Sequence, residues 1–259
     1  MDLSAIDYGL ILTIAFLSES YSVSFGGGSI ISVPALIALG IPPKIAIAHI
    51  VGSTIGSQSA GFIQLSKKSK IYWKISLFLI PFHLIGIFIG KHFLDSISED
   101  FLLILIIIFI TIYFLHSIFS KTPVANDDGK DEVTKENVLF LIILGILSGA
   151  YIAFAGLGIG IILSVLLVSF LNISFVASIG IRKMIGLPSY LLALILYAHS
   201  GLIVWKLLFS LLVVNFLAGT IGMKIFFKIP EKLAKKIFFI LIVVLYAFLI
   251  YKIGVKFFL

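Results

Sequence analysis

The chain has 259 residues, of which 61% are hydrophobic and only 12% are charged. Soluble domains are about 25% charged, so this composition excludes a soluble globular protein and predicts an integral membrane protein. Cysteine is absent, which excludes disulfides and thiolate metal sites. The net charge of +7 comes mostly from lysines between apolar runs, and such lysines indicate how the chain is oriented in a membrane rather than binding to nucleic acid.

Ten apolar segments follow one another along the chain, five on each side of a polar stretch at 120–137. A membrane crossing needs roughly 20 residues, and most of the segments reach that length. The segments 29–40 and 159–171 measure only ~18–20 Å as helices, so we expect half-helices or strongly tilted short helices there. The other segments lie near 6–25, 44–65, 71–94, 100–119, 138–155, 174–197, 203–226 and 233–256.

A glycine cluster precedes each of the two short segments. The first is Gly26-Gly27-Gly28, and the second contains Gly156 and Gly158. Apolar residues flank both clusters, so we expect both breaks at membrane depth, where unpaired backbone groups are tolerated only inside protein or against a watery cavity. Two broken segments at matching places in the two halves of a chain are typical of transporters, whereas close helix packing by small residues is the alternative explanation.

The two halves of the chain match each other at a fixed spacing of 132 residues. Three separate matches at one spacing are hard to attribute to a shared apolar composition, so they indicate an internal repeat. The matches are Trp73-Lys74 with Trp205-Lys206, Gly90 with Gly222, and Ile97-Ser98-Glu99 with Ile229-Pro230-Glu231.

Lysine-rich loops occupy different places in the two halves. In the first half the basic loop at 67–70 precedes an acidic loop at 95–100, whereas in the second half the loop at 198–202 has no lysine and the next, at 224–236, is rich in lysine. Because cytoplasmic loops carry the excess of lysine and arginine, this shift predicts that the halves are inserted in opposite orientations, with both basic loops inside the cell and the other two outside.

These observations predict an all-α polytopic membrane protein of the cell inner (plasma) membrane. We expect two inverted-topology repeats of about five helical segments each, with the glycine-broken short helices at the centre. The expected boundaries are 1–119 for the first transmembrane repeat, 120–137 for a polar cytoplasmic linker and 138–259 for the second transmembrane repeat.

Several short motifs rich in glycine, proline and other small residues are distributed along the chain. They are Gly26-Gly27-Gly28 leading to Val33-Pro34, then Gly40-Ile41-Pro42-Pro43, Ala46-Ile47-Ala48, Ser59-Ala60-Gly61 and Gly186-Leu187-Pro188. This pattern resembles the TauE/SafE sulfite exporter family, also called DUF81, over nearly the whole chain. The resemblance implies export or uptake of sulfite, organosulfonates or related small anions. The chain departs from the family pattern at His49 and at Arg182-Lys183, which leaves the exact substrate open.

Three charged residues lie deep in predicted spans, where a charge is costly and marks a functional candidate. Glu19 lies ~20 Å along the first predicted helix, and Arg182 and Lys183 lie ~12–14 Å into theirs. One alternative is that Glu19 neutralises a cation between packed helices. The other is that a cation binds an anion and Glu19 carries a coupling proton, with Arg182 preferred because a guanidinium donates two hydrogen bonds to an oxyanion.

The third predicted helix supplies a polar stripe. His49, Ser53 and Ser57 share one face at helical spacing, and Gln58 lies beside them. Such a stripe either lines a cavity or joins helices through hydrogen bonds. His83, in the middle of the next segment, can relay protons or bond a backbone carbonyl. Both short helices would also point their N-terminal amides and dipoles at the membrane centre, which favours an anion there.

We therefore predict a secondary transporter that exports small anions such as sulfite, organosulfonates or related sulfur oxyanions, driven by an ion gradient through alternating access. No enzyme motif and no Walker motif appears, so we expect no enzyme activity, cofactor or metal. The expected partners are a small anion, the lipid bilayer and a coupling proton or sodium ion, and a homo-oligomer is left open. The alternatives are an anion channel or passive pore, a carboxylate transporter, and an intramembrane enzyme or non-transporting assembly partner.

The expected substrate-binding residues are Gly26, Gly27, Gly28, His49, Ser53, Ser57, Gln58, Gly156, Gly158, Arg182 and Lys183, and the expected coupling residue is Glu19.

Overall fold

The computed structural model describes residues 4–67, 71–119 and 129–228, in which it contains helices and no strands. Each of these helices begins and ends within two residues of a segment predicted from the sequence. The predicted segment at 233–256, the lysines after Lys228 and part of the predicted linker lie outside the described residues. The helices are α1 (Ala5–Phe25), α2 (Ser29–Ala38), α3 (Pro43–Ser66), α4 (Trp73–Ser96), α5 (Glu99–Phe119), α6 (Val138–Phe154), α7 (Ile159–Leu171), α8 (Phe175–His199) and α9 (Trp205–Phe226).

Short polar side chains determine where several helices begin. At the start of α1 the Ser4 hydroxyl accepts a hydrogen bond from the Asp7 amide at 3.1 Å, and the Asp7 carboxylate accepts one from the Ser4 amide at 3.3 Å, which is a capping box. The Asp131 carboxylate accepts hydrogen bonds from the amides of Lys74 and Ile75 at 3.1 and 3.0 Å. The described part of the linker therefore caps α4 and is docked on its first turn.

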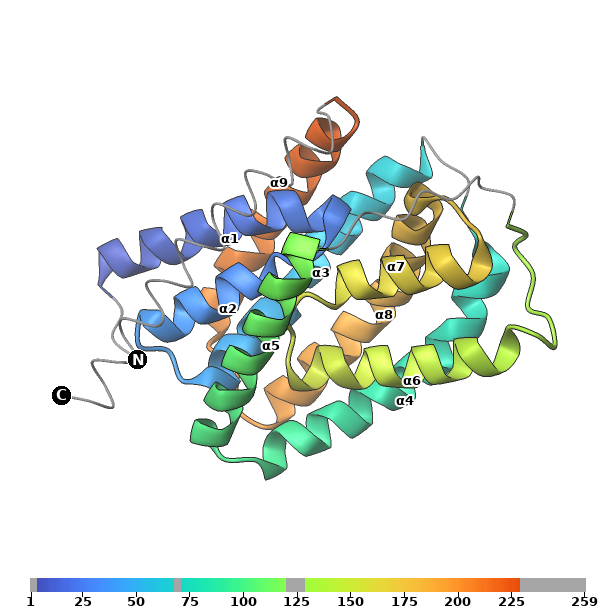
Figure 1. Ribbon diagram of the computed structural model, residues 1–259. Coiled ribbons are helices and arrows are strands. Elements are labelled where there is room, and N and C mark those ends of the chain that lie inside the picture. The colour runs from blue at the N-terminus through green and yellow to red at the C-terminus, as the bar shows by residue number, and fades with distance from the viewer. Residues whose placement is uncertain (1–3, 68–70, 120–128, 229–259) are drawn as a thin grey trace.

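The two halves of the chain are interlocked. Helices α1 and α3 of the first half pack along α9, and α6 and α8 of the second half pack along α4, as Figure 1 shows for α6 and α4. At the spacing of 132 residues α1 corresponds to α6, α3 to α8 and α4 to α9, so the packing partners of one half mirror those of the other. This is the arrangement that a two-fold relation between the repeats predicts.

The two central helices, α3 and α8, correspond to each other and cross in opposite directions. Gly52 of α3 lies against Leu194 of α8, whereas Gly61, further along α3, lies against Lys183, which comes earlier in α8. The helices therefore run antiparallel. Inverted repeats require corresponding helices to run in opposite directions, and the orientation of each half in the membrane stays a prediction.

The loops gather at the two ends of the bundle. At one end the Tyr72 hydroxyl donates to the Gly129 carbonyl at 3.0 Å, and the Gly129 amide donates to the Asn172 carbonyl at 3.0 Å. At the other end the Lys91 ammonium donates to the Ser200 hydroxyl at 2.6 Å. The first end thus holds the linker with the loops after α3 and α7, and the second holds the loops after α4 and α8. The lysine pattern predicts that the linker lies at the same end as the loop after α3 and that the loops after α4 and α8 lie together at the other end.

The surface of the described bundle suits a lipid environment. Helices α1, α4, α8 and α9 are long and apolar enough to cross a membrane, and large apolar side chains such as Leu77, Phe88, Phe209 and Val213 are exposed on α4 and α9. Helix α3 is as long as these but carries the polar stripe, and most of it is buried at the centre of the bundle. The chain is an integral, multi-pass membrane protein.

The grouping of the loops leads to a labelling prediction. The chain contains no cysteine, so cysteines introduced singly at Ser66 and Ser98, both exposed, are the only thiols. We expect a membrane-impermeant maleimide to label Ser98→Cys in intact cells and Ser66→Cys only after the membrane is opened, because basic loops stay in the cytoplasm. Ser200→Cys should behave like Ser98→Cys. Labelling of Ser66→Cys and Ser98→Cys from one side would contradict the inverted insertion.

Candidate functional site

The two glycine breaks meet at one cavity, which we call the main cavity. Its empty space is ≈ 420 Å³ when the open space at its mouth is included, and it is lined by residues of both halves of the chain, including the charged side chains of Glu19 and Arg182. The breaks and these two charges, which the sequence singled out separately, therefore border one space. The lining consists of Glu19, Ser22, Gly26, Gly27, Ser29, Val51, Thr54, Gln58, Ile152, Gly156, Gly158, Ile159, Gly160, Arg182 and Tyr190.

Arg182 lies where the two breaks approach each other. A Cβ atom added to Gly26 would lie 2.9 Å from Arg182 Nη1 and 2.8 Å from the backbone carbon of Gly160, and a Cβ added to Gly160 would overlap the same guanidinium. The breaks can approach this closely only because neither position has a side chain. The amide of Gly158 also donates to the Ser29 hydroxyl at 2.9 Å, which ties the second break to the first short helix.

Both short helices begin at the wall of the main cavity. Helix α2 begins at Ser29 and α7 begins at Ile159, both residues line the cavity, and neither helix has a side-chain N-cap. The first amides of a helix have no partner within the helix, and the helix dipole adds partial positive charge there. Two helix N-termini and a guanidinium therefore border the same space, which favours a small anion.

Arg182 has one fixed hydrogen bond and one vacant donor. Its side chain is buried, its Nη2 donates to the Ser24 carbonyl at 2.8 Å, and its Nε has no partner. A buried donor without an acceptor is costly. Because Arg182 lines the main cavity, an oxyanion in that cavity can supply the missing acceptor.

Glu19 lines the same cavity and is 3% exposed. Its carboxylate accepts a hydrogen bond from the Ser57 hydroxyl at 2.7 Å. Within the described ranges no lysine or arginine nitrogen lies within 4.0 Å of that carboxylate. The alternative in which Glu19 is directly paired with Arg182 or Lys183 is therefore not what the structure shows.

Lys183 follows Arg182 on α8 but does not line the main cavity. It is fully buried, and its aliphatic chain packs on α3, where a Cβ added to Gly61 would lie 2.9 Å from Lys183 Cε. Its ammonium group has no hydrogen-bond partner. Neighbouring residues of a helix point about 100° apart, and this separation places the two cations in different surroundings.

The polar stripe of His49, Ser53 and Ser57 joins α3 to other helices and does not line the main cavity. Gln58 does line the cavity, because it lies about 100° around the helix from Ser57. Gly28 also lies outside the lining, because it packs closely against α1. The stripe's partners are the Val204 amide, which donates to His49 Nε2 at 3.0 Å, Asn215 Nδ2, which donates to the Ser53 hydroxyl at 3.0 Å, and the Glu19 carboxylate, which accepts from Ser57 at 2.7 Å.

Four polar residues of the lining were not among the expected site residues: Ser22, Ser29, Thr54 and Tyr190. Tyr190 corresponds to Gln58 at the spacing of 132 residues, so the internal repeat is the signal that could have found it. Thr54 lies one turn before Gln58 on the same face of α3. Ser22 and Ser29 flank the first break, and nothing else in the sequence marks them.

A side cavity adjoins the main cavity and shares Gln58, Arg182 and Tyr190 with it; its empty space is ≈ 280 Å³ when the open space at its mouth is included. His83 of α4 lines only the side cavity, and its Nδ1 lies 2.7 Å from the Ser189 hydroxyl. The bond to a backbone carbonyl that the sequence suggested for His83 is therefore replaced by a bond to a serine of α8.

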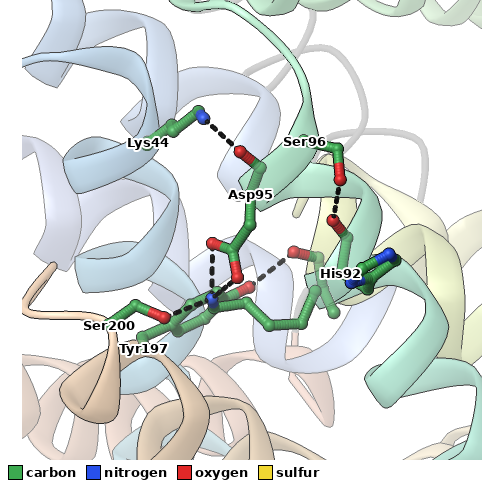
Figure 2. Close-up of polar contacts among 8 residues, drawn as sticks. Lys44, His92, Asp95, Ser96, Tyr197 and Ser200 are labelled. Carbon is green, nitrogen blue, oxygen red and sulfur yellow. Dashed lines mark hydrogen bonds and ion pairs between the residues drawn. The ribbon is translucent and has the colours of Figure 1, made fainter.

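A further polar cluster lies away from both cavities, near the loops after α4 and α8. Lys91 forms an ion pair with Asp95 at 2.6 Å and donates to Ser200 at 2.6 Å, while the Lys44 ammonium donates to the Asp95 carbonyl at 3.2 Å. Figure 2 shows Asp95 between Lys44 and Ser200, with Tyr197 alongside. The cluster joins helices of both halves at that end. Among the described residues no group of three or more His, Asp or Glu side chains could hold a metal ion.

The contact between the breaks leads to a stability prediction. Gly26→Ala is expected to destabilise the protein, because the added methyl group would lie 2.8 Å from backbone atoms of Gly160 and Ile161 and because the φ of Gly26 is +83°, which disfavours a side chain. Overpacking of this kind costs about 1–3 kcal/mol. Thermal unfolding in detergent measures the effect, and Gly9→Ala in α1 is the matched control, since nothing lies within 4 Å of its Cβ position. Equal melting temperatures for the two variants would refute the close approach.

Comparison with known proteins gives matches along most of the chain. The family described as "Sulfite exporter TauE/SafE" matches residues 11–249. A "Probable membrane transporter protein" of Haemophilus influenzae is 24% identical over 227 residues, which cover 86% of this chain and 87% of that protein. The "Probable membrane transporter protein YfcA" of Escherichia coli K12 is 23% identical over 246 residues, which cover 94% of this chain and 89% of that protein. No solved structure matches the chain.

Proposed function

Since the chain belongs to the TauE/SafE sulfite exporter family and is a membrane transporter, we propose that it is a secondary transporter that exports small anions such as sulfite, organosulfonates or related sulfur oxyanions. One observation carries the proposal: the two glycine breaks, the N-termini of α2 and α7, and Arg182 line a single cavity. Each of these elements favours a negatively charged ligand.

In this proposal Arg182 is the main anion-binding residue. Its unpartnered Nε donates to the oxygens of the anion, and the positive ends of the dipoles of the two short helices attract its charge. The glycines of both breaks allow the anion to approach the backbone, and Gln58 contributes an amide to the same lining. The polar stripe, Gly28 and Lys183 lie outside the lining of this site. In this proposal the stripe supports the site through hydrogen bonds between helices, and Gly28 and Lys183 support it through packing.

Coupling to an ion gradient is assigned to Glu19. Its carboxyl group lines the same cavity as Arg182, so a proton on Glu19 and an anion beside Arg182 can be exchanged with the same side of the membrane. The hydrogen bond from Ser57 fixes the orientation of the carboxyl group. Alternating access follows in this proposal from rocking of the repeats around the shared site.

Transport by the purified protein in proteoliposomes tests the proposal. We expect a sulfonate to accumulate above its external concentration when a pH gradient is imposed, and protein-free liposomes to show no accumulation. A sulfonate is a better probe than sulfite because it stays ionised and does not cross lipid as a neutral acid. Movement only down the concentration gradient would instead indicate a channel, and a preference for simple carboxylates would indicate a carboxylate transporter.

A further inference from the structure

The hydrogen bonds around His83 determine which of its ring nitrogens carries the proton. The Ser189 hydroxyl donates to the Ile185 carbonyl at 2.7 Å, and two oxygens at that distance require the hydroxyl hydrogen between them. The same hydroxyl oxygen lies 2.7 Å from His83 Nδ1 and must therefore accept a hydrogen bond there. Nδ1 of the neutral ring thus carries the proton, and Nε2 presents a lone pair.

That lone pair is buried and has no partner. His83 is fully buried, its Nε2 makes no hydrogen bond, and the residue lines the side cavity together with Arg182 and Gln58. The Oε1 atom of Gln58 is likewise without a partner. The side cavity therefore offers two vacant acceptors beside the cation of the proposed anion site.

No protein group of the described helices around His83 fills the vacancy. Helix α6 packs on this part of α4 with Gly145 and Gly149, which have no side chains. Helix α8 contributes Arg182 and Tyr190 to the cavity lining, and neither donates a hydrogen bond to Nε2. A buried acceptor left without a donor is costly, so a ligand that supplies the donor is favoured over one that does not.

We propose that His83 is a specificity residue, whose Nε2 accepts a hydrogen bond from the transported anion. The site then selects oxyanions that carry an O–H or N–H donor next to the charged group, such as hydroxy- or amino-sulfonates or a protonated sulfur oxyanion. Arg182 holds the charged oxygens, and His83 holds the donor group from the side cavity. This inference rests on the proposed anion transport through the main cavity.

The second repeat offers a matched variant. Asn215 occupies the position that corresponds to His83 at the spacing of 132 residues, and its Nδ2 donates to the Ser53 hydroxyl at 3.0 Å. Asparagine places its Nδ2 as many bonds from Cα as Nδ1 of the histidine ring, so an asparagine at position 83 can keep the hydrogen bond to Ser189 while removing the acceptor that Nε2 provides. A glutamine at this position extends its carbonyl further and can restore that acceptor.

The experiment compares two sulfonates that differ by one hydroxyl group, 2-hydroxyethanesulfonate and ethanesulfonate, in calorimetric titrations of the purified protein. The wild type is expected to bind the hydroxylated probe about 5- to 150-fold more tightly, which is the range for one buried acceptor left unsatisfied. His83→Asn should abolish this preference by weakening only the hydroxylated probe, and His83→Gln should keep part of it.

Equal affinity of the wild type for the two probes overturns the role of His83 and leaves anion transport standing. The role of His83 is equally overturned if a folded His83→Asn protein keeps the full preference. Failure of the wild type to bind either sulfonate or sulfite overturns the proposed function together with this inference. The wild-type comparison needs no variant, so the test holds even where a substitution prevents folding.

Discussion

Arg182→Gln is expected to weaken anion binding by about 10- to 150-fold while the protein remains folded. The loss corresponds to one hydrogen bond to a charged group, which is worth about 1.5–3 kcal/mol. Among the described residues Arg182 is the cation that lines the main cavity, and its Nε donor has no protein partner. The protein hydrogen bond lost with the guanidinium is the one from Nη2 to the Ser24 carbonyl at 2.8 Å. Titration of a sulfonate or of sulfite into the purified protein measures the change in affinity.

Lys183→Gln provides the matched control for this experiment. It removes the same charge from the adjacent position of α8, but Lys183 lies outside the cavity and its ammonium group has no hydrogen-bond partner. We expect the affinity of this variant to stay within a factor of a few of the wild type, because the anion site is unchanged. If both variants lose affinity equally, or if Arg182→Gln loses none, Arg182 is a structural charge and the anion site lies elsewhere.

Glu19→Gln is expected to abolish accumulation driven by a pH gradient and to preserve exchange of the anion across the membrane. Glutamine keeps the shape of the side chain and can still accept a hydrogen bond from Ser57, but it cannot carry a coupling proton. Counterflow in proteoliposomes measures the exchange, and uptake under an imposed pH gradient measures the coupling. Asp7→Asn, a half-buried acid in the first turn of the same helix that lies outside the lining of the main cavity, should leave both unchanged.

The competing explanation for Glu19 predicts a loss of stability instead. Removing one partner of a buried ion pair typically costs about 3–5 kcal/mol, and such a loss would lower the melting temperature of Glu19→Gln. The distance criterion argues against this outcome, because no cation of the described residues lies within 4.0 Å of the carboxylate. A stable variant that still accumulates anion with the pH gradient would move the coupling role to another group or to a sodium ion.

The sequence predicted the breaks and the length of the helices well, because both depend on local chemistry. Apolar runs of about 20 residues indicate spans, and glycine clusters between them indicate where a helix stops. The two short helices, Ser29–Ala38 and Ile159–Leu171, accordingly begin where the sequence placed them. The internal repeat then implied that the two breaks share one site, and both line the main cavity.

The sequence could not show which face of α3 borders the main cavity. His49, Ser53 and Ser57 form the more obvious polar stripe, but polar side chains inside a membrane protein also join helices. The stripe is directed toward α1 and α9, and the cavity is bordered by the neighbouring face that carries Thr54 and Gln58. This distinction depends on which helices pack around α3, and the spacing of residues within one helix carries no information about that.

The interlocking of the two halves has a consequence for biosynthesis. Gly86 and Gly90 of α4 are in close contact with the backbone of α6 around Ala150, yet α4 leaves the ribosome before α6 exists. Helices α1 and α3 must likewise wait for α9, the last described helix to be made. Neither half can reach its final packing alone, so assembly within the bilayer follows insertion of most of the chain. A nascent chain that stops before α6 would leave the glycine face of α4 open to unrelated helices and to quality-control proteases.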